Sequence, residues 1–169
     1  MTPIPKSPDR AALPGGDEIR RLIPHAGTMC LLERVLAWTD TTIACGSTTH
    51  AVPDNPLRRD GRISAVCGIE YGLQAMAIHG ALRGGARQPV GYLVRLGDVR
   101  CDVDFLDQLG ADLTVRAEIV QSLATGYSYN FSIVGGDPPA NAGHTAPPAN
   151  AGHTAPPAIV GRATIALVG

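Results

Sequence analysis

The sequence predicts an α+β domain in which an antiparallel sheet covers one long helix. Residues 65–82 are apolar on almost every side and carry a single formal charge, that of Glu70. Shorter stretches before and after them are rich in β-branched or alternating residues, which favours strands. A helix without a polar face has to be enclosed, and a sheet curling around it is the simplest enclosure.

The elements before this helix follow from local signals. Residues 1–16 are rich in proline and glycine and are expected to form an irregular lead-in, whereas residues 17–22 favour one or two helical turns. Residues 29–39 and 41–50 favour two strands. Two prolines and the pairs Asp-Asn and Asp-Gly indicate that residues 52–62 form a loop leading into the helix.

The helix has its own start and stop signals. Ser64 is a candidate N-cap, and the pair Gly84 and Gly85 ends the helix. Four further strands are predicted after the helix, in residues 90–103, 113–123, 127–134 and 159–168. Gly126 is placed to form the turn between the second and the third of them. Residues 17–169 are therefore expected to form a single domain.

A tandem repeat interrupts the last part of the chain. The sequence PPANAGHTA stands at residues 138–146 and again at 147–155. So much proline, alanine and glycine cannot bury an apolar face, and we expect a flexible duplicated loop at about residues 137–157. His144 and His153 have no nearby Cys, Asp or Glu ligands, so we expect no metal site.

The composition argues against several classes of protein. The chain has 169 residues, a net charge of −1 and 17% charged residues, which suits one globular domain and gives no sign of a nucleic-acid partner. The first residues lack the apolar core of a signal peptide, and the four cysteines have no paired CxxC spacing, so a cytoplasmic protein is expected. Residues 65–82 reach membrane-spanning length, but Glu70, Gln74, His79 and three glycines make a poor lipid-facing surface, so no membrane contact is expected.

Glu70 is the best functional clue in the sequence. An isolated carboxyl in apolar surroundings is costly when ionised, so it tends to stay protonated, which is what a general acid near neutral pH requires. Gln74 lies one helical turn later on the same face, where it could orient the carboxyl, bind substrate or satisfy its amide in the core. Glu70 could instead be an inert ionised group held by Arg58, Arg59 or Arg62.

Two segments resemble a known family. The sequence LIPHAGTMCLLERVL at residues 22–36 resembles the L-P-H-R-x-P-x-L-L-x-D-R-V opening of the 3-hydroxyacyl-acyl-carrier-protein dehydratases of the hotdog fold. Glu70 with Gln74 resembles the E-x-x-x-Q at the start of their central helix. Residues 50–82 look closer still to the dehydratase-like proteins of aryl-polyene and related polyketide gene clusters. The resemblance implies a hotdog fold and the dehydration of a 3-hydroxyacyl thioester without a cofactor.

The resemblance also implies the residues of a site. A histidine before the helix is the catalytic partner in this family, and the matching position is His50, which would act as base with Glu70 as acid. The family's glycine amide for the thioester carbonyl has no clear counterpart, and Gly68 and the free amides of the first helical turn are the substitutes that we expect. The link from His50 to Glu70 is longer than the family's, so it must bulge if the two side chains are to meet. His25 and His79 are interpreted as structural.

The partners are implied in the same way. Family members take substrates carried by the phosphopantetheine arm of an acyl carrier protein and pair as dimers, so a homodimer or a heterodimer with a related hotdog protein is expected. In such a dimer each site takes its histidine and its acid from different subunits. Arginine clusters usually form a solvated face, but Arg58 and Arg59 stand just before the helix and are expected to bind the acidic carrier.

Two other functions stay open. The chain could be a non-catalytic or half-site partner subunit of a heteromeric dehydratase, because the link after His50 departs from the family's pattern. It could also be a hotdog acyl thioesterase, which hydrolyses the thioester with an acidic residue and water. The combination of His50 with Glu70 favours the dehydratase.

Overall fold

The chain folds around its long helix with the elements in the predicted order. The computed structural model describes residues 13–84, 90–136 and 156–168. The repeat at residues 138–155 and the first part of the lead-in lie outside the described residues, so the expectations for them stay predictions. The helices and strands are α1 (Gly16–Leu22), β1 (Arg34–Trp38), β2 (Thr42–Ser47), α2 (Gly68–Gly84), β3 (Val90–Cys101), β4 (Asp112–Leu123), β5 (Gly126–Gly136) and β6 (Ile159–Val168). Single 3-10 turns lie at Gly27–Met29, Thr49–Ala51, Ala65–Cys67 and Leu106–Gln108.

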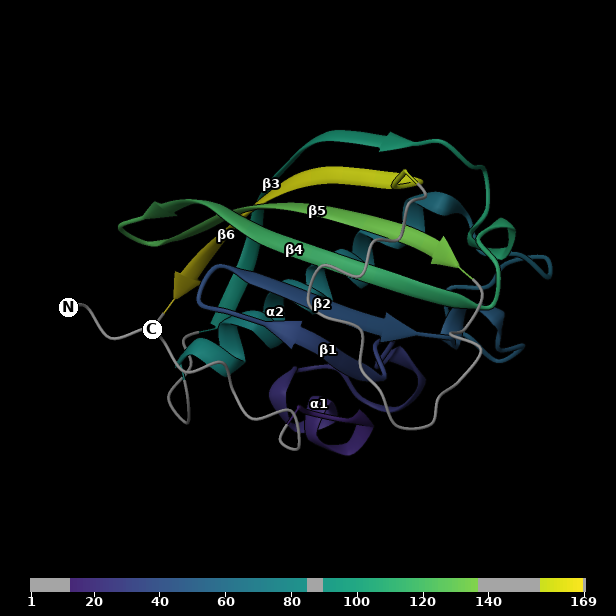
Figure 1. Ribbon diagram of the computed structural model, residues 1–169, viewed down its shortest axis with the longest axis horizontal. Coiled ribbons are helices and arrows are strands. Elements are labelled where there is room, and N and C mark those ends of the chain that lie inside the picture. Colours follow the sequence, from purple (N-terminus) through teal and green to yellow (C-terminus); the bar gives the residue numbers. More distant parts are fainter. Residues whose placement is uncertain (1–12, 85–89, 137–155, 169) are drawn as a thin grey trace.

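The strands form one antiparallel sheet in the order β1-β2-β4-β5-β6-β3 (Figure 1). The long helix α2 lies across one face of this sheet, against β2, β4, β5 and β6, and α1 packs against it as well. The predicted α+β arrangement, with an antiparallel sheet around a central apolar helix, is therefore confirmed.

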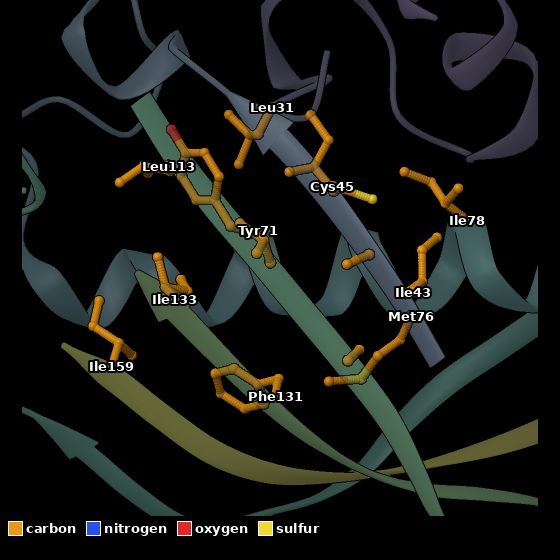
Figure 2. Packing of buried hydrophobic residues seen from close by; sticks show 14 of the residues in the cluster. Leu31, Ile43, Cys45, Tyr71, Met76, Ile78, Leu113, Phe131, Ile133 and Ile159 are labelled. Atoms are coloured by element: carbon orange, nitrogen blue, oxygen red, sulfur yellow. The ribbon is translucent and has the colours of Figure 1, made fainter. Parts of the chain in front are cut away.

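The core lies between α2 and the concave face of the sheet (Figure 2). Burial raises the pKa of the Cys45 thiol to about 12, so this thiol stays protonated and unreactive. The four cysteines are free, and Cys101 is exposed. The labelled core side chains come from α2, from β2, β4, β5 and β6, and from the segment before β1: Leu31, Ile43, Cys45, Tyr71, Met76, Ile78, Leu113, Phe131, Ile133 and Ile159.

Glycine is required at the start of β5. Gly126 pairs with Leu123 across the tight β4–β5 connection, which confirms the predicted turn. A Cβ atom on Gly126 would lie 1.9 Å from the carbonyl oxygen of Ile165 in β6. Since that oxygen is backbone, no larger residue fits without moving the sheet.

The start of the central helix differs from the prediction. The Ser64 side chain makes no capping hydrogen bond, and a 3-10 turn at Ala65–Cys67 precedes α2. Ser64 instead forms an isolated bridge with Phe105, and the Ala65 N–H donates to the Asp104 carbonyl at 2.8 Å. A backbone anchor thus takes the place of the predicted side-chain cap.

Strand β3 is the exposed edge of the sheet. It pairs with β6 along one side, and no strand of the described chain pairs with its other side. On this strand Tyr92 is 57% exposed and Val94 is 60% exposed. Rows of apolar side chains on an open strand edge favour pairing with another chain.

Candidate functional site

Glu70 is the centre of a small polar cluster at the start of α2. Its side chain is 28% exposed, and Nε2 of His25 lies 3.0 Å from its Oε1. Nε2 of Gln74 donates to the same oxygen at 3.0 Å. No side chain or amide of the described residues bonds to Oε2. The sequence led us to expect an isolated, buried carboxyl. In the structure the carboxyl is partly exposed and is held through one of its two oxygens.

Gln74 is the fully buried support of this carboxyl. Its Oε1 accepts the N–H of Leu31 at 2.9 Å, and its Nε2 also donates to the carbonyl of Met29 at 2.8 Å. Two of the predicted uses of Gln74 are thus met together, because the amide is satisfied in the core and also orients Glu70. These bonds draw the backbone of residues 29–31 onto the helix, which explains why the strand predicted from residue 29 begins only at Arg34.

The segment of residues 25–31, which carries His25, is fixed by hydrogen bonds. The Cys30 thiol donates to the His25 carbonyl at 3.2 Å. The carbonyl of Leu31 accepts hydrogen bonds from Ser47 at 2.6 Å and from Thr49 at 2.9 Å. His25 reaches Glu70 because this segment crosses the start of α2. The sequence signal was its place in the opening motif, but only the fold brings a residue 45 positions away to the carboxyl.

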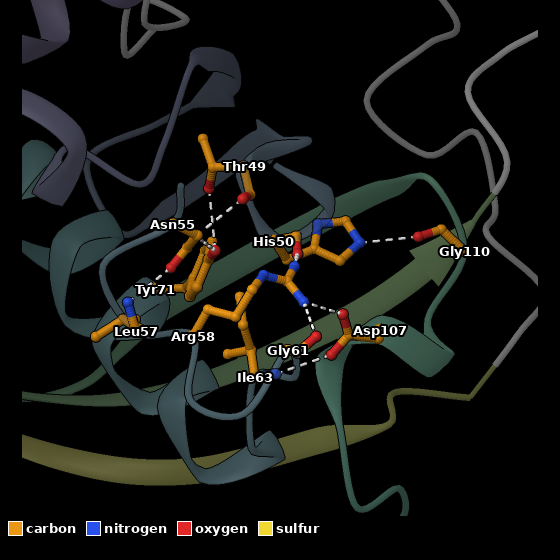
Figure 3. Close-up of polar contacts among 10 residues, drawn as sticks. All are labelled: Thr49, His50, Asn55, Leu57, Arg58, Gly61, Ile63, Tyr71, Asp107 and Gly110. Carbon is orange, nitrogen blue, oxygen red and sulfur yellow. Dashed lines mark hydrogen bonds and ion pairs between the residues drawn. The ribbon is translucent and has the colours of Figure 1, made fainter. Parts of the chain in front are cut away.

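His50 lies in the 3-10 turn Thr49–Ala51 and is fully buried (Figure 3). Its Nε2–H donates to the Gly110 carbonyl at 2.8 Å, and its Nδ1 is buried without a hydrogen-bond partner. Within the described chain no hydrogen bond or ion pair joins His50 to Glu70. The two predicted catalytic side chains are thus not in contact in a single chain, and their joint role stays a prediction.

The loop after His50 is anchored to the helix by a network around Tyr71 (Figure 3). Asn55 donates to the Thr49 carbonyl at 2.8 Å and to the Tyr71 hydroxyl at 3.1 Å, and its Oδ1 accepts the Leu57 N–H at 2.9 Å. Burial raises the pKa of Tyr71, so the hydroxyl stays neutral in this network. Asn55 is a residue that sequence reasoning did not single out.

The predicted docking arginines have different surroundings. Arg58 is only 15% exposed, and its guanidinium bonds to Asp107 at 2.7 Å, to the Gly61 carbonyl at 2.6 Å and to the His50 carbonyl. Arg59 is exposed and bonds only to the backbone carbonyls of Pro56 and Arg58. Arg58 is therefore bonded within the chain, whereas Arg59 faces outward, and the carrier contact expected of both stays a prediction.

Asp107 is the counter-charge of the loop. Burial raises the pKa of Asp107, but the hydrogen bonds from the Ile63 amide and Arg58 outweigh it and hold the net pKa below the usual range. An ion pair between Glu70 and a loop arginine is not present among the described residues, because Arg58 pairs with Asp107 and Glu70 with His25.

Gly68 packs tightly at the first turn of α2. Its N–H donates to the carbonyls of Ala65 and Val66, so this amide is not free to hold a thioester oxygen. A Cβ atom on Gly68 would lie 2.7 Å from Ile159 Cδ1 and 2.9 Å from Ile133 Cδ1. Glycine at this position permits close contact between the helix and the sheet, and the expected role of Gly68 in carbonyl binding stays a prediction.

Across residues 13–84, 90–136 and 156–168, no three His, Cys, Asp or Glu side chains are grouped so as to hold a metal ion. Among the described helices, none combines the length and the apolarity needed to cross a membrane.

Comparison with known proteins identifies the family of the chain. The chain matches the family model of the ApeP dehydratases over residues 17–144. A search of curated proteins found no match. Similar solved structures include the dehydratase heterocomplex ApeI:P from Xenorhabdus doucetiae, with 21% identity, a TM-score of 0.64 and coverage of 89% of this chain and 91% of that chain.

Two thioesterases share the architecture. One, from Haemophilus influenzae, is 10% identical with a TM-score of 0.58 and coverage of 91% of this chain and 90% of that chain. The other, a mutant from Pseudomonas aeruginosa, is 12% identical with a TM-score of 0.52 and coverage of 80% of both chains. At these identities the structures establish the hotdog fold alone. Because the family model spans most of the sequence, the resemblance found in residues 22–36 and 50–82 is confirmed, and the chain belongs to the ApeP-like family of hotdog dehydratases.

Proposed function

We propose that this protein removes water from a 3-hydroxyacyl thioester, carried on an acyl carrier protein, to give a trans-2-enoyl thioester in fatty acid or aryl-polyene and polyketide biosynthesis. The observation that supports the proposal best is the Glu70 carboxyl at the start of α2. One of its oxygens is held by His25 and Gln74, and the other has no partner within the described chain. A carboxyl fixed in this way can exchange a proton with a bound substrate through Oε2.

The reaction needs one base and one acid. The base takes a proton from the carbon next to the thioester carbonyl, and the acid protonates the departing hydroxyl, which leaves as water. Glu70 is proposed as the acid and His50 as the base. In one chain the Nε2–H of His50 donates to the Gly110 carbonyl, which leaves Nδ1 as the basic nitrogen, so this role requires the complete site to bring the substrate to Nδ1.

A second hotdog subunit is proposed to complete the assembly. The free edge of β3, with Tyr92 and Val94 exposed, offers backbone groups and apolar side chains to another strand. The similar structure named ApeI:P is a dehydratase heterocomplex, which supports a related hotdog protein as the partner.

An acyl carrier protein is proposed to dock near the start of α2, with Arg59 as a contact. Arg59 is exposed, and no acidic side chain of the described residues pairs with it. Replacing Arg59 by glutamate should slow turnover of a carrier-bound substrate at low salt and leave turnover of a pantetheine thioester unchanged. If the substitution changes neither rate, or slows turnover of the two substrates by the same factor, this docking contact is contradicted.

The direct test is a mass-spectrometric assay of purified protein with 3-hydroxyacyl-carrier substrates, with and without a related hotdog dehydratase. Wild-type protein should produce the enoyl thioester with loss of water, and Glu70→Gln should lose this activity while remaining folded. His50→Ala should lose it too if His50 is the base. Release of free acid and thiol without an enoyl product would instead indicate a thioesterase.

A half-site partner subunit is the second candidate function. The burial of His50 against Gly110 favours it, because a histidine held in this way is not presented to a substrate. In that case the wild-type chain should be inert alone and should restore activity when mixed with a related dehydratase. Full activity of the chain as a pure homodimer would exclude this candidate.

A further inference from the structure

We infer that His25 is a positioning residue for Glu70, a role that rests on the proposed dehydratase function. Nε2 of His25 lies 3.0 Å from Oε1 of Glu70, within hydrogen-bond distance. The contact joins the opening segment to the first turn of α2. It is the one contact of the His25 imidazole with a polar side chain among the described residues.

A purely structural histidine in this fold looks different. His79, further along α2, is fully buried and uses both ring nitrogens, with Nε2 2.8 Å from the Thr39 carbonyl and Nδ1 3.1 Å from the Tyr129 hydroxyl. His25 is partly exposed and leaves its buried Nδ1 without a partner. A buried polar atom without a partner costs free energy, and packing alone does not explain it.

The geometry indicates what His25 does for the carboxyl. Oε1 of Glu70 accepts a hydrogen bond from the Gln74 amide, and Nε2 of His25 lies 3.0 Å from the same oxygen. Gln74 is fixed by its bonds to Met29 and Leu31. The two contacts therefore hold Oε1 and leave Oε2 for the substrate.

The proton balance gives His25 its place in the reaction. The Oε2–H bond of Glu70 breaks, its proton joins the departing hydroxyl, and the C–O bond of the substrate breaks as water leaves. Negative charge then develops on the Glu70 carboxyl, where the His25 and Gln74 donors stabilise it. The proton removed from the substrate carbon by the base returns to Glu70 through exchange with solvent.

The kinetic test compares His25→Ala with His25→Gln, whose amide can place an N–H donor near Oε1 of Glu70. His25→Ala should lower kcat by about 10- to 100-fold with KM little changed, since a polar contact with a developing charge is lost. His25→Gln should recover most of this loss. Thr28→Ala, an exposed substitution in the same segment, should behave like wild type.

A second measurement does not depend on activity. The ¹⁵N chemical shifts of the histidine rings should report the pairing, so Glu70→Gln should move the Nε2 signal of His25 and leave the signals of His79 in place. If wild type forms no enoyl product in any mixture but this shift is seen, the proposed function fails and the pairing stands. If wild type is active and the shift is absent, or His25→Ala keeps the wild-type kcat, the role of His25 is overturned.

Discussion

Gln74 is the residue at which the opening segment and the central helix meet. Replacing it by leucine would leave the Leu31 N–H and the Met29 carbonyl without partners in a buried place. We expect a loss of roughly 2 to 4 kcal/mol in the free energy of unfolding, because buried polar groups without partners cost more than a hydrogen bond gains. Urea denaturation measures it, with the exposed Gln121→Leu as a control that should change stability little. Equal losses in the two variants would contradict this account.

His79 makes stability depend on pH. Burial, aided by the positive charge of Arg83, lowers the pKa of His79 below its ordinary 6.5, and the neutral ring bonds to Thr39 and Tyr129. The unfolded ring therefore takes up a proton at a higher pH than the folded ring. The contribution of His79 is fully present above about pH 6.5 and declines as the pH falls below that value.

The measurement is urea denaturation of wild type and His79→Gln between pH 8 and about pH 5. The wild-type protein should lose more stability on acidification than the variant, because the variant lacks this titrating group. The other histidines are present in both proteins and cancel in the difference. Parallel curves for the two proteins would show that His79 does not carry the effect.

At the scale of elements, the central helix has one face that tolerates a methyl group and one that does not. A Cβ atom on Gly72 would lie 2.8 Å from the Phe131 ring, whereas a Cβ atom on Gly80 meets nothing within 4 Å. Gly72→Ala should destabilise the protein by about 1 to 3 kcal/mol through overpacking. Gly80→Ala should stabilise it by about 0.5 to 1 kcal/mol, since alanine favours helix.

Thermal or urea unfolding of the two alanine variants measures this difference, and each variant is the matched control for the other. The two glycines lie on the same helix and differ in what surrounds them. A helix wrapped loosely by its sheet would accept both substitutions equally, so equal stabilities would contradict the close packing of α2 on β5.

At the scale of the whole molecule, the two edges of the sheet predict where a partner binds. Val94 on β3 and Leu36 on β1 are both exposed and apolar, but they lie at opposite edges. Val94→Lys should disrupt assembly, because a charge on the pairing strand opposes the addition of another strand. Leu36→Lys should leave assembly unchanged. Light scattering after size-exclusion chromatography measures the assembly of each variant, alone and mixed with a related hotdog protein. Loss of assembly in both variants would contradict pairing through β3.

The elements were largely predictable because their signals are local. The apolar run of residues 65–82 predicted α2, and the glycines that follow it predicted where α2 ends. The alternating stretches after it predicted β3 to β6 within a few residues. Ser64 was a less reliable guide, since its N-cap role was taken over by the Asp104 carbonyl and the bridge to Phe105, neither of which a local pattern contains.

The sequence by itself determined the fold class, the central helix, and Glu70 with Gln74 as neighbours on one helical face, because these depend on residue spacing within a single element. Only the tertiary structure decided that His25 contacts Glu70 and that Arg58 forms an ion pair with Asp107. It also decided that His50 is bonded to Gly110 and that β3 is an exposed edge strand. These contacts join residues far apart in the chain. Their geometry depends on how the segments cross in the packed domain, which no local pattern of residues encodes.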